Sequence, residues 1–478
     1  MLVVDVGSSS VRAAIVRPDG EVAHVHRQAT PPVVPMPGLV EFDAAAMAAA
    51  ALDVAGAALA AGGPVDAVGV TAQRASTVVW DAGTGAPIGP GLGWQDLRTA
   101  GTCLELQGEG IRLSPNESAT KAAWLLDTYA ADRGGHLRIG TVDSWITWNL
   151  TAGRDHVTDL SNAAASGLIG FESQAWRTDV LERLRIPLTS LPAVVDSSGQ
   201  LTGPTVLAGQ PPVCGIAGDQ QASLIGQGCT RPGLAKATFG TGAMLDVCVG
   251  PQRPGFSKRG DGGCFPIVAW RRAGEVAWGV EAIMLAAGSA VDWLVEDLGL
   301  LSSAAESEQA AAACDDTEGV VAVPALLGLG TPAWDFGARG AMLGLTRGTT
   351  KAHLVRAVLE GVAHSGADLL EAAETDAGIH VHALRVDGGM TANGVFLQAL
   401  ADATGRPVEV SAQLEATTLG AGYLAGLAVG TWVDEEEIAD AWSPRAVVEP
   451  VSSPDRSRWA GAVDRAKGWY PELTALEF

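Results

Sequence analysis

An aspartate followed by two glutamines stands at the end of an apolar, glycine-rich run. Residues 215–222 read G-I-A-G-D-Q-Q-A, so Asp219 and Gln220 share one short segment. A carboxylate in this position can accept the proton of an attacking hydroxyl group, and Gln220 can hydrogen-bond to the same substrate. The alternative is structural, because an aspartate often caps the helix that follows it. The residues alone leave these two interpretations equally open.

Two turns of small residues are candidates for binding the phosphates of a nucleotide. Residues 5–10 read D-V-G-S-S-S after a strand-like run, and residues 239–242 read F-G-T-G in a second strand–turn–strand segment. Glycine lets a phosphate approach the backbone closely, and hydroxyl and N–H groups can donate hydrogen bonds to it. Asp5, at the end of its strand, can organise a Mg²⁺ ion through water. Each turn taken alone is more often an ordinary hairpin turn.

A third candidate lies at residues 387–393, where D-G-G-M-T-A-N joins a strand to a helix. Paired glycines admit a flat ligand close to the backbone, and the N-terminus of a helix favours anions. A nucleotide site and an ordinary strand-to-helix turn are both open interpretations of this segment.

The segments around these motifs alternate between strand and helix patterns, which predicts an α/β fold. One strand–turn–strand unit begins the chain, and a unit of the same plan recurs at 237–249. We therefore expect a duplicated architecture in which each copy turns one loop toward a shared cleft. The expected strands are 2–6, 11–16, 67–71, 76–81, 319–323 and 383–387, and the expected helices are 43–61, 351–375, 393–404 and 414–429.

Length, charge and cysteine content limit the possible functions. A chain of 478 residues fits two domains, which we place at 1–227 and 228–478. The net charge of −23, from 31 basic and 54 acidic residues, disfavours nucleic acid and membrane surfaces as partners. Six scattered cysteines without a C-x-x-C pair, and a first strand without a basic leader, predict a cytoplasmic protein. We expect the alanine-rich stretch 44–61 to be a helix of a soluble fold and not a membrane span.

Ten short motifs, taken in order, resemble those of the FGGY carbohydrate kinases, and of the glycerol kinases within that family most closely. The resemblance extends from Asp5 to about Trp469. Any one motif can arise by chance, but the ordered set cannot plausibly do so. The motifs are D-V-G-S-S-S-V-R (5–12), G-V-T-A-Q-R (69–74), G-W-Q-D-L-R-T (93–99), T-V-D-S-W (141–145), H-V-T-D-L-S-N-A (156–163), G-I-A-G-D-Q-Q-A (215–222), F-G-T-G (239–242), G-L-G-T-P-A-W-D (328–335), G-A-M-L-G-L-T-R-G (340–348) and L-R-V-D-G-G (384–389).

The resemblance implies two ribonuclease-H-like domains of the actin/hexokinase type. ATP and the substrate would lie in a cleft between them, and closure of the cleft would exclude water. By position, Asp219 corresponds to the family's catalytic base and Asp5 to the acid that organises Mg²⁺. The implied substrate contacts are Arg74, Trp94, Asp219 and Gln220. The implied nucleotide contacts are Gly7, Ser8, Ser9, Ser10, Arg12, Gly240, Thr241, Gly288, Gly389 and Asn393.

The chain departs from the glycerol kinase pattern at three substrate-contact positions. Ala75 replaces a glutamate, Asn116 a tyrosine and Met244 a phenylalanine, which removes one acceptor for substrate hydroxyl groups and two aromatic walls. We therefore expect an active kinase, dependent on ATP and Mg²⁺, for a small polyol or keto-sugar, with a four- or five-carbon compound preferred over glycerol.

Two other functions stay open at this point. One is a true glycerol kinase, and the other is a non-catalytic nucleotide-binding sensor on the same fold. Retention of both Asp5 and Asp219 argues against the sensor, because a protein that only binds nucleotide does not need a catalytic base. The sequence does not decide between a monomer and a homodimer.

Overall fold

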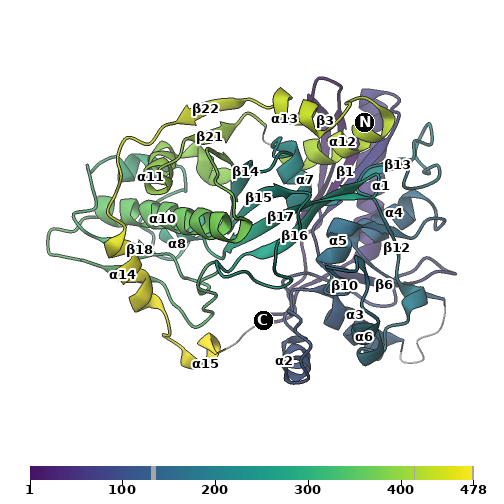
Figure 1. The fold of residues 1–478 in the computed structure, drawn as a ribbon, viewed down its shortest axis with the longest axis horizontal. Coiled ribbons are helices and arrows are strands. Elements are labelled where there is room, and N and C mark those ends of the chain that lie inside the picture. Colours follow the sequence, from purple (N-terminus) through teal and green to yellow (C-terminus); the bar gives the residue numbers. More distant parts are fainter. Residues whose placement is uncertain (131–135, 414, 476–478) are drawn as a thin grey trace.

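The structure is a computed structural model that describes residues 1–130, 136–413 and 415–475. It has two lobes, each built on one large β-sheet (Figure 1). The N-terminal sheet runs, in spatial order, β13 (Val213–Gly218), β5 (Val68–Ala72), β1 (Leu2–Val6), β2 (Ser10–Val16) and β3 (Val22–Ala29). The C-terminal sheet runs β16 (Phe265–Arg272), β17 (Glu275–Met284), β15 (Ala243–Gly250), β14 (Ala235–Phe239), β20 (Leu384–Asp387), β21 (Val408–Ser411) and β22 (Pro444–Val448).

The two sheets repeat one strand order. In the N-terminal lobe β1, β2 and β3 form an antiparallel meander, and β5 and β13 add to β1 in parallel. In the C-terminal lobe β14, β15 and β17 form the corresponding antiparallel trio, with β16 between β15 and β17 in the chain, and β20 and β21 add to β14 in parallel. Strands β16 and β22 extend the C-terminal copy at its two edges. The duplicated architecture predicted from the two strand–turn–strand units is therefore confirmed.

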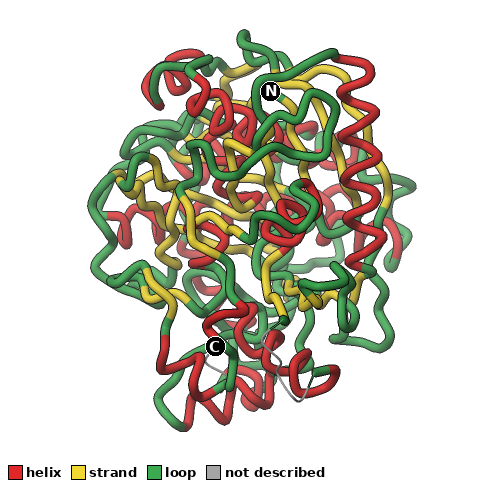
Figure 2. The backbone as a smooth tube through the Cα atoms, turned by 90° about the vertical axis from the view of Figure 1, so that its right-hand side faces the viewer, coloured by secondary structure: helices red, strands yellow, loops and turns green. Residues whose placement is uncertain are grey.

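Helices flank both sheets, and Figure 2 shows the strands in the middle of the molecule with helices on either side. In the N-terminal lobe α1 (Ala44–Gly62) begins after the capping side chain of Asp43 and packs, with α4 (Val142–Leu150), on the sheet. In the C-terminal lobe α8 (Gly288–Glu296), the long α10 (Lys351–Ala377) and α11 (Gly394–Thr404) cover the second core.

One helix of the described residues, α1, is long and apolar enough to cross a membrane by length and composition. Half of that stretch is buried inside the N-terminal lobe, where Met47, Val54 and Leu59 pack against the sheet. This is the packing of a core helix.

Short elements complete the lobes. The strands are β4 (Glu41–Phe42), β6 (Thr77–Asp81), β7 (Gly91–Leu92), β8 (Leu137–Thr141), β9 (Val157–Asp159), β10 (Ile169–Gly170), β11 (Ala175–Trp176), β12 (Ala193–Val195), β18 (Val321–Val323) and β19 (Ala341–Leu343). The helices are α2 (Ala100–Gly108), α3 (Ser118–Tyr129), α5 (Leu160–Ala164), α6 (Thr178–Arg183), α9 (Glu306–Ala311), α13 (Glu435–Ala441), α14 (Ser457–Ala466) and α15 (Pro471–Thr474).

The lobes meet where α7 (Asp219–Gly226) packs against α12 (Ala416–Val429). The two helices approach so closely that a Cβ atom on Gly420 would overlap the backbone oxygen of Ala222, and one on Gly226 would overlap that of Ala416. The alanine- and glycine-rich composition of α12 is therefore required by this contact. It joins the C-terminal lobe directly to the helix that begins with Asp219.

The sequence-based boundaries agree with these elements to within a few residues. The largest difference among the strands is 319–323, which was expected to be a strand in full, while β18 covers only Val321–Val323. The helix expected over 414–429 begins at Ala416, and Leu414 lies outside the described residues. All six cysteines are free, and five of them are buried, as small apolar side chains are.

Candidate active site

Asp219 is the first residue of α7 and follows directly on strand β13. Gly218, and not Asp219, occupies the position that caps the helix. The Oδ1 atom of Asp219 accepts a hydrogen bond from the N–H of Gln220 at 2.9 Å and lies 3.6 Å from Arg74 Nε. Burial raises the pKa of this carboxyl group, and the charge of Arg74 opposes that rise. A carboxylate whose pKa is raised is a better proton acceptor than an ordinary aspartate.

Asp5 is the last but one residue of strand β1 and is almost completely buried. Its Oδ2 atom accepts a hydrogen bond from Thr418 Oγ1 at 3.2 Å and lies 3.4 Å from Arg12 Nε. Burial raises the pKa of Asp5, while Arg12 and Thr418 act to lower it. The negative charge of Asp5 in turn raises the pKa of Asp219, so the two carboxylates share one electrostatic environment.

The donor set around Asp5 fits a Mg²⁺ ion that is held mainly by phosphates and water. No cluster of three or more His, Cys, Asp or Glu side chains able to hold a metal occurs among the described residues. Mg²⁺ typically keeps several waters and uses one or two carboxylates together with substrate phosphates. The hydrogen bond and ion pair to Asp5 both involve Oδ2, so Oδ1 is the oxygen available to a hydrated ion.

The first small-residue turn joins β1 to β2 and connects to the substrate side of the site. The N–H of Gly7 donates to the carbonyl of Ser10 at 3.0 Å, which closes the turn. Ser8 Oγ donates to Gln73 at 3.0 Å and accepts from the indole N–H of Trp94 at 3.2 Å. Ser9 is exposed, and Ser10 begins β2.

Arg12, predicted as a nucleotide contact, pairs with two carboxylates. It lies beside Asp5 and forms a second ion pair with Glu415, the residue that precedes α12. Glu415 therefore neutralises part of the charge that Arg12 would offer to a phosphate. A nucleotide contact by Arg12 stays a prediction.

The second turn, between β14 and β15, lies against the start of α8 and the loop after β20. The N–H of Gly288 donates to the carbonyl of Gly240 at 2.8 Å, and Ala287 and Ser289 donate to the carbonyl of Thr241. A Cβ atom on Gly388 would overlap the backbone of Phe239, so the glycine pair 388–389 abuts the same turn. The structure thus brings together Gly240, Thr241, Gly288 and Gly389, which the sequence comparison assigned to the nucleotide.

Asn393 lies at the beginning of α11, and both ends of its amide are engaged. Its Oδ1 atom accepts the N–H of Phe396 at 3.0 Å, and its Nδ2 atom donates to Ser307 at 3.0 Å. The side chain is 9% exposed. Asn393 acts as the cap of α11, as in an ordinary strand-to-helix turn, which was the alternative given for residues 387–393. Contact with a nucleotide stays a prediction.

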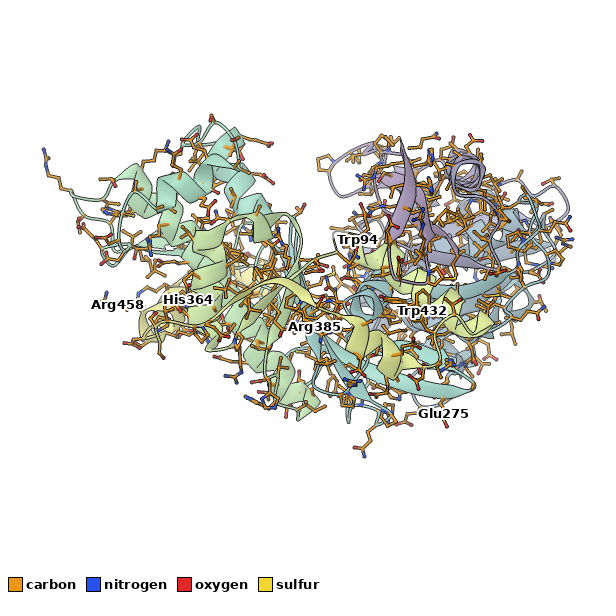
Figure 3. The ribbon with its side chains drawn as sticks, turned by 90° about the horizontal axis from the view of Figure 1, so that it is seen from above. Trp94, Glu275, His364, Arg385, Trp432 and Arg458 are labelled. Atoms are coloured by element: carbon orange, nitrogen blue, oxygen red, sulfur yellow. The ribbon has the colours of Figure 1, made fainter. Side chains whose placement is uncertain are left out.

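Two of the predicted substrate contacts, Arg74 and Gln220, lie directly beside Asp219. Arg74 Nη2 donates to Glu281 at 2.7 Å, and Gln220 follows Asp219 on α7. Met244 is half-buried on β15. Trp94 lies on the side of the N-terminal lobe that faces the other lobe (Figure 3).

The two remaining substitutions add little polar chemistry to the pocket. Ala75 is buried in a left-handed backbone conformation, with φ of 59°, and offers no polar side chain. Asn116 is exposed; its amide donates to the carbonyl of Trp94 at 3.0 Å and accepts from Ser114 at 3.3 Å. Both polar ends of Asn116 are therefore used within the protein.

Three charged residues beside the site were not predicted from the sequence: Lys236, Asp246 and Glu281. Lys236 pairs with Asp246 across β14 and β15, and Asp246 pairs with Glu281 across β15 and β17. Lys236 and Asp246 stand five residues on either side of Thr241, so the register of this hairpin would have predicted their contact. Glu281 carried no such local signal.

Comparison with known proteins gives matches over the whole chain. The sequence matches the N-terminal domain of the FGGY family of carbohydrate kinases over residues 1–226 and the C-terminal domain of that family over residues 236–429. A glycerol kinase of Trichlorobacter lovleyi is 43% identical, with 98% of this chain and 99% of the relative aligned. Glycerol kinase 2 of Thermotoga maritima is 40% identical, with 98% and 99% aligned.

Solved structures share the two-lobed fold. The crystal structure of Plasmodium falciparum glycerol kinase with ADP has a TM-score of 0.89 at 26% identity and covers 100% of this chain and 99% of its own. A xylulose kinase from Rhodospirillum rubrum has a TM-score of 0.81 at 23% identity, covering 99% and 97%, which is a likeness of fold alone. The predicted actin/hexokinase-type architecture is confirmed by these matches.

Proposed function

The chain belongs to the FGGY family of carbohydrate kinases, a family of ATP-using phosphotransferases that act on an alcohol group, and from this we propose that it phosphorylates a hydroxyl group of a small polyol or keto-sugar. The observation that carries the proposal is the position of Asp219. It is a carboxylate of raised pKa at the junction of the lobes, next to Arg74 and Gln220 and under the electrostatic influence of Asp5. This is the arrangement expected of a general base for an attacking hydroxyl.

In the proposed reaction the substrate hydroxyl loses its proton to Asp219 while its oxygen forms a bond to the γ-phosphorus of ATP. The bond between that phosphorus and the bridging oxygen breaks, and ADP leaves. Arg74 and Gln220 orient the substrate, and the turns 7–10 and 240–242 supply N–H and hydroxyl donors to the phosphates. Mg²⁺, when bound near Asp5, would neutralise phosphate charge.

We further propose that the preferred substrate has four or five carbons. The position of the family's glutamate is Ala75, so no carboxylate there accepts substrate hydroxyls, and the amide of Asn116 is bonded to Trp94 and Ser114. Fewer polar groups and no aromatic wall at Met244 leave a small triol with fewer fixed contacts. A specific observation favours the second candidate, glycerol: relatives about 40% identical over nearly their full length are named glycerol kinase.

An ADP-release assay with ATP and Mg²⁺ tests the proposal. The panel is glycerol, dihydroxyacetone, erythritol, threitol, xylitol, ribulose and xylulose. We expect turnover on at least one compound, with a larger one preferred over glycerol. A preference for glycerol over every larger compound would establish the second candidate, and absence of turnover on an extended panel would support a nucleotide-binding sensor.

A further inference from the structure

The three charged residues Lys236, Asp246 and Glu281, here called the charged row, lie side by side on neighbouring strands of the C-terminal sheet. They are cross-strand partners on β14, β15 and β17. The side chains of Lys236 and Asp246 are completely buried, and that of Glu281 is 6% exposed. Burying three ionised groups is costly unless each has a partner, so their contacts indicate what they are used for.

Lys236 fixes the orientation of Gln220. Its ammonium group forms an ion pair with Asp246 Oδ2 at 2.8 Å and donates to Gln220 Oε1 at 2.7 Å and to Thr238 at 3.3 Å. Burial disfavours the charge of Lys236, but the carboxylates of Asp246, Asp387 and Glu281 together outweigh burial, and the pKa of the lysine is raised. An ammonium group has no acceptor, so the amide oxygen of Gln220 must face Lys236 and its NH₂ group must point away.

Glu281 fixes Arg74 in a similar way. Glu281 Oε2 accepts from Arg74 Nη2 at 2.7 Å, while Asp219 lies beside Arg74 Nε. The guanidinium group is planar, so the hydrogen bond at Nη2 and the nearby charge of Asp219 at Nε together restrict the direction of Nη1. Neither Arg74 Nη1 nor Gln220 Nε2 has a hydrogen-bond partner among the described residues. Both contacts also join the two family domains, because Arg74 and Gln220 lie within residues 1–226 and the charged row lies within residues 236–429.

We propose that the charged row is a positioning device: it holds Gln220 and Arg74 so that both present only N–H donors beside Asp219, and the pocket thereby selects a keto-sugar over the matching polyol. This inference rests on the proposed function. A ketone oxygen accepts hydrogen bonds and has no proton of its own. A hydroxyl in the same place can also accept, but its proton then needs an acceptor, and Ala75 supplies none.

The expected size of the selection follows from that unpaired proton. An unsatisfied polar group in a closed site typically costs about tenfold in affinity or more. We therefore expect dihydroxyacetone to bind about tenfold more tightly than glycerol, and xylulose about tenfold more tightly than xylitol. The comparison within each pair keeps the number of carbons constant, so pocket size does not enter it.

The test is the double variant Lys236→Met, Asp246→Leu. Removing both partners keeps the net charge and leaves no buried charge unpaired, whereas Lys236→Met alone would strand Asp246. Without Lys236, Gln220 can turn its oxygen toward the substrate. The matched control is Lys467→Met, Asp464→Leu, which removes an exposed ion pair of 3.0 Å on the C-terminal lobe. Calorimetry with an unreactive ATP analogue measures the affinity for each ketose and polyol.

We expect the ketose-to-polyol affinity ratio to fall from about 10 to about 1–2 in the double variant. It should stay at the wild-type value in the control, with nucleotide affinity unchanged in both. A merely structural role would change both affinities together and leave the ratio constant. Equal affinities in the wild type, a wild-type preference for polyols, no binding of either compound, or an unchanged ratio in the double variant would each overturn the inference. Turnover is scored separately: binding with the expected ratio but without ADP release would refute the proposed function and retain the positioning role.

A second variant, Glu281→Gln, tests whether Glu281 positions Arg74. The amide keeps the shape and can still accept from Arg74 through its oxygen, but the charge of the ion pair is lost, so the guanidinium is held less firmly. We expect kcat/KM to fall at least tenfold for every substrate when it is measured well below the thermal midpoint, which the loss of a buried charged partner lowers. Wild-type kcat/KM in this variant would show that Glu281 does not position Arg74.

Discussion

Replacing Asp219 by asparagine separates the two roles that its position allows. If Asp219 is the general base, Asp219→Asn removes the proton acceptor and should lower kcat by 10²–10⁴, which corresponds to about 2.7–5.4 kcal/mol in the activation free energy. If Asp219 only stabilises the start of α7 through its charge, the variant should have a lower unfolding free energy and a nearly unchanged kcat.

The structure limits the stability loss to a small value. Asparagine retains the Oδ1 acceptor for the N–H of Gln220, and Arg74 keeps its partner Glu281. The side chain of Asp219 is 33% exposed and its contact with Arg74 is 3.6 Å, so that pair contributes at most about 1 kcal/mol. The charge at the helix N-terminus contributes about 0.3–1 kcal/mol, and removing a partly desolvated charge offsets part of both. We expect a change in unfolding free energy within about 1 kcal/mol.

Three measurements check the prediction on one sample: initial rates of ADP release at saturating ATP, nucleotide affinity by calorimetry, and the thermal midpoint. Asp179→Asn is a matched control, because Asp179 also stands in the first turn of a helix and pairs with an arginine, at 3.3 Å, but on α6. Since the pKa of Asp219 is raised, wild-type kcat/KM should begin to fall at a higher pH than for an ordinary aspartate as the base becomes protonated. Near-wild-type turnover, or a loss of activity matched by a large loss of stability, would refute the role of Asp219 as the general base.

Three further changes have expected outcomes. The triple variant Ala75→Glu, Asn116→Tyr, Met244→Phe should raise kcat/KM for glycerol at least tenfold, which corresponds to about 1.4 kcal/mol. It should lower kcat/KM for the larger substrate. A wild type that already prefers glycerol would contradict this prediction. Gly420→Val should destabilise the fold by about 3 kcal/mol or more, because the valine side chain would overlap the backbone of α7. Chemical denaturation measures the loss of unfolding free energy. An unchanged unfolding free energy would mean that α7 and α12 can move apart. Burial raises the pKa of Asp143 to about 7, so the carboxyl group keeps its proton to a higher pH in the folded state than in the unfolded chain. The wild type therefore loses stability as pH rises toward 7. Asp143→Asn should therefore gain in thermal midpoint relative to the wild type at pH 8 and less at pH 5, and the opposite order would show that the ionised form is the favoured one.

Much of the fold could be predicted from residues close together in the chain. The hairpin turn at Gly7 and the helices α1 and α10 depend on local backbone preferences, and each was predicted to within a few residues. The recurrence of one strand–turn–strand plan also indicated the duplication of the sheet. The position of Asp5 near the end of its strand followed from the same local patterns, whereas the strand before Asp219 was not among the expected ones.

The contacts between distant segments needed the tertiary structure. Arg74 meets Glu281 across 207 residues, and Lys236 meets Gln220 from the neighbouring lobe. Strand order and register decide which side chains become neighbours, and neither is encoded in residues next to each other in sequence. The same holds for Asn393, whose amide serves as a helix cap because Ser307 and Phe396 lie within reach. Local preferences therefore specified the elements and the residue types of the site, whereas the sheet order and the packing of the lobes decided how those residues are oriented.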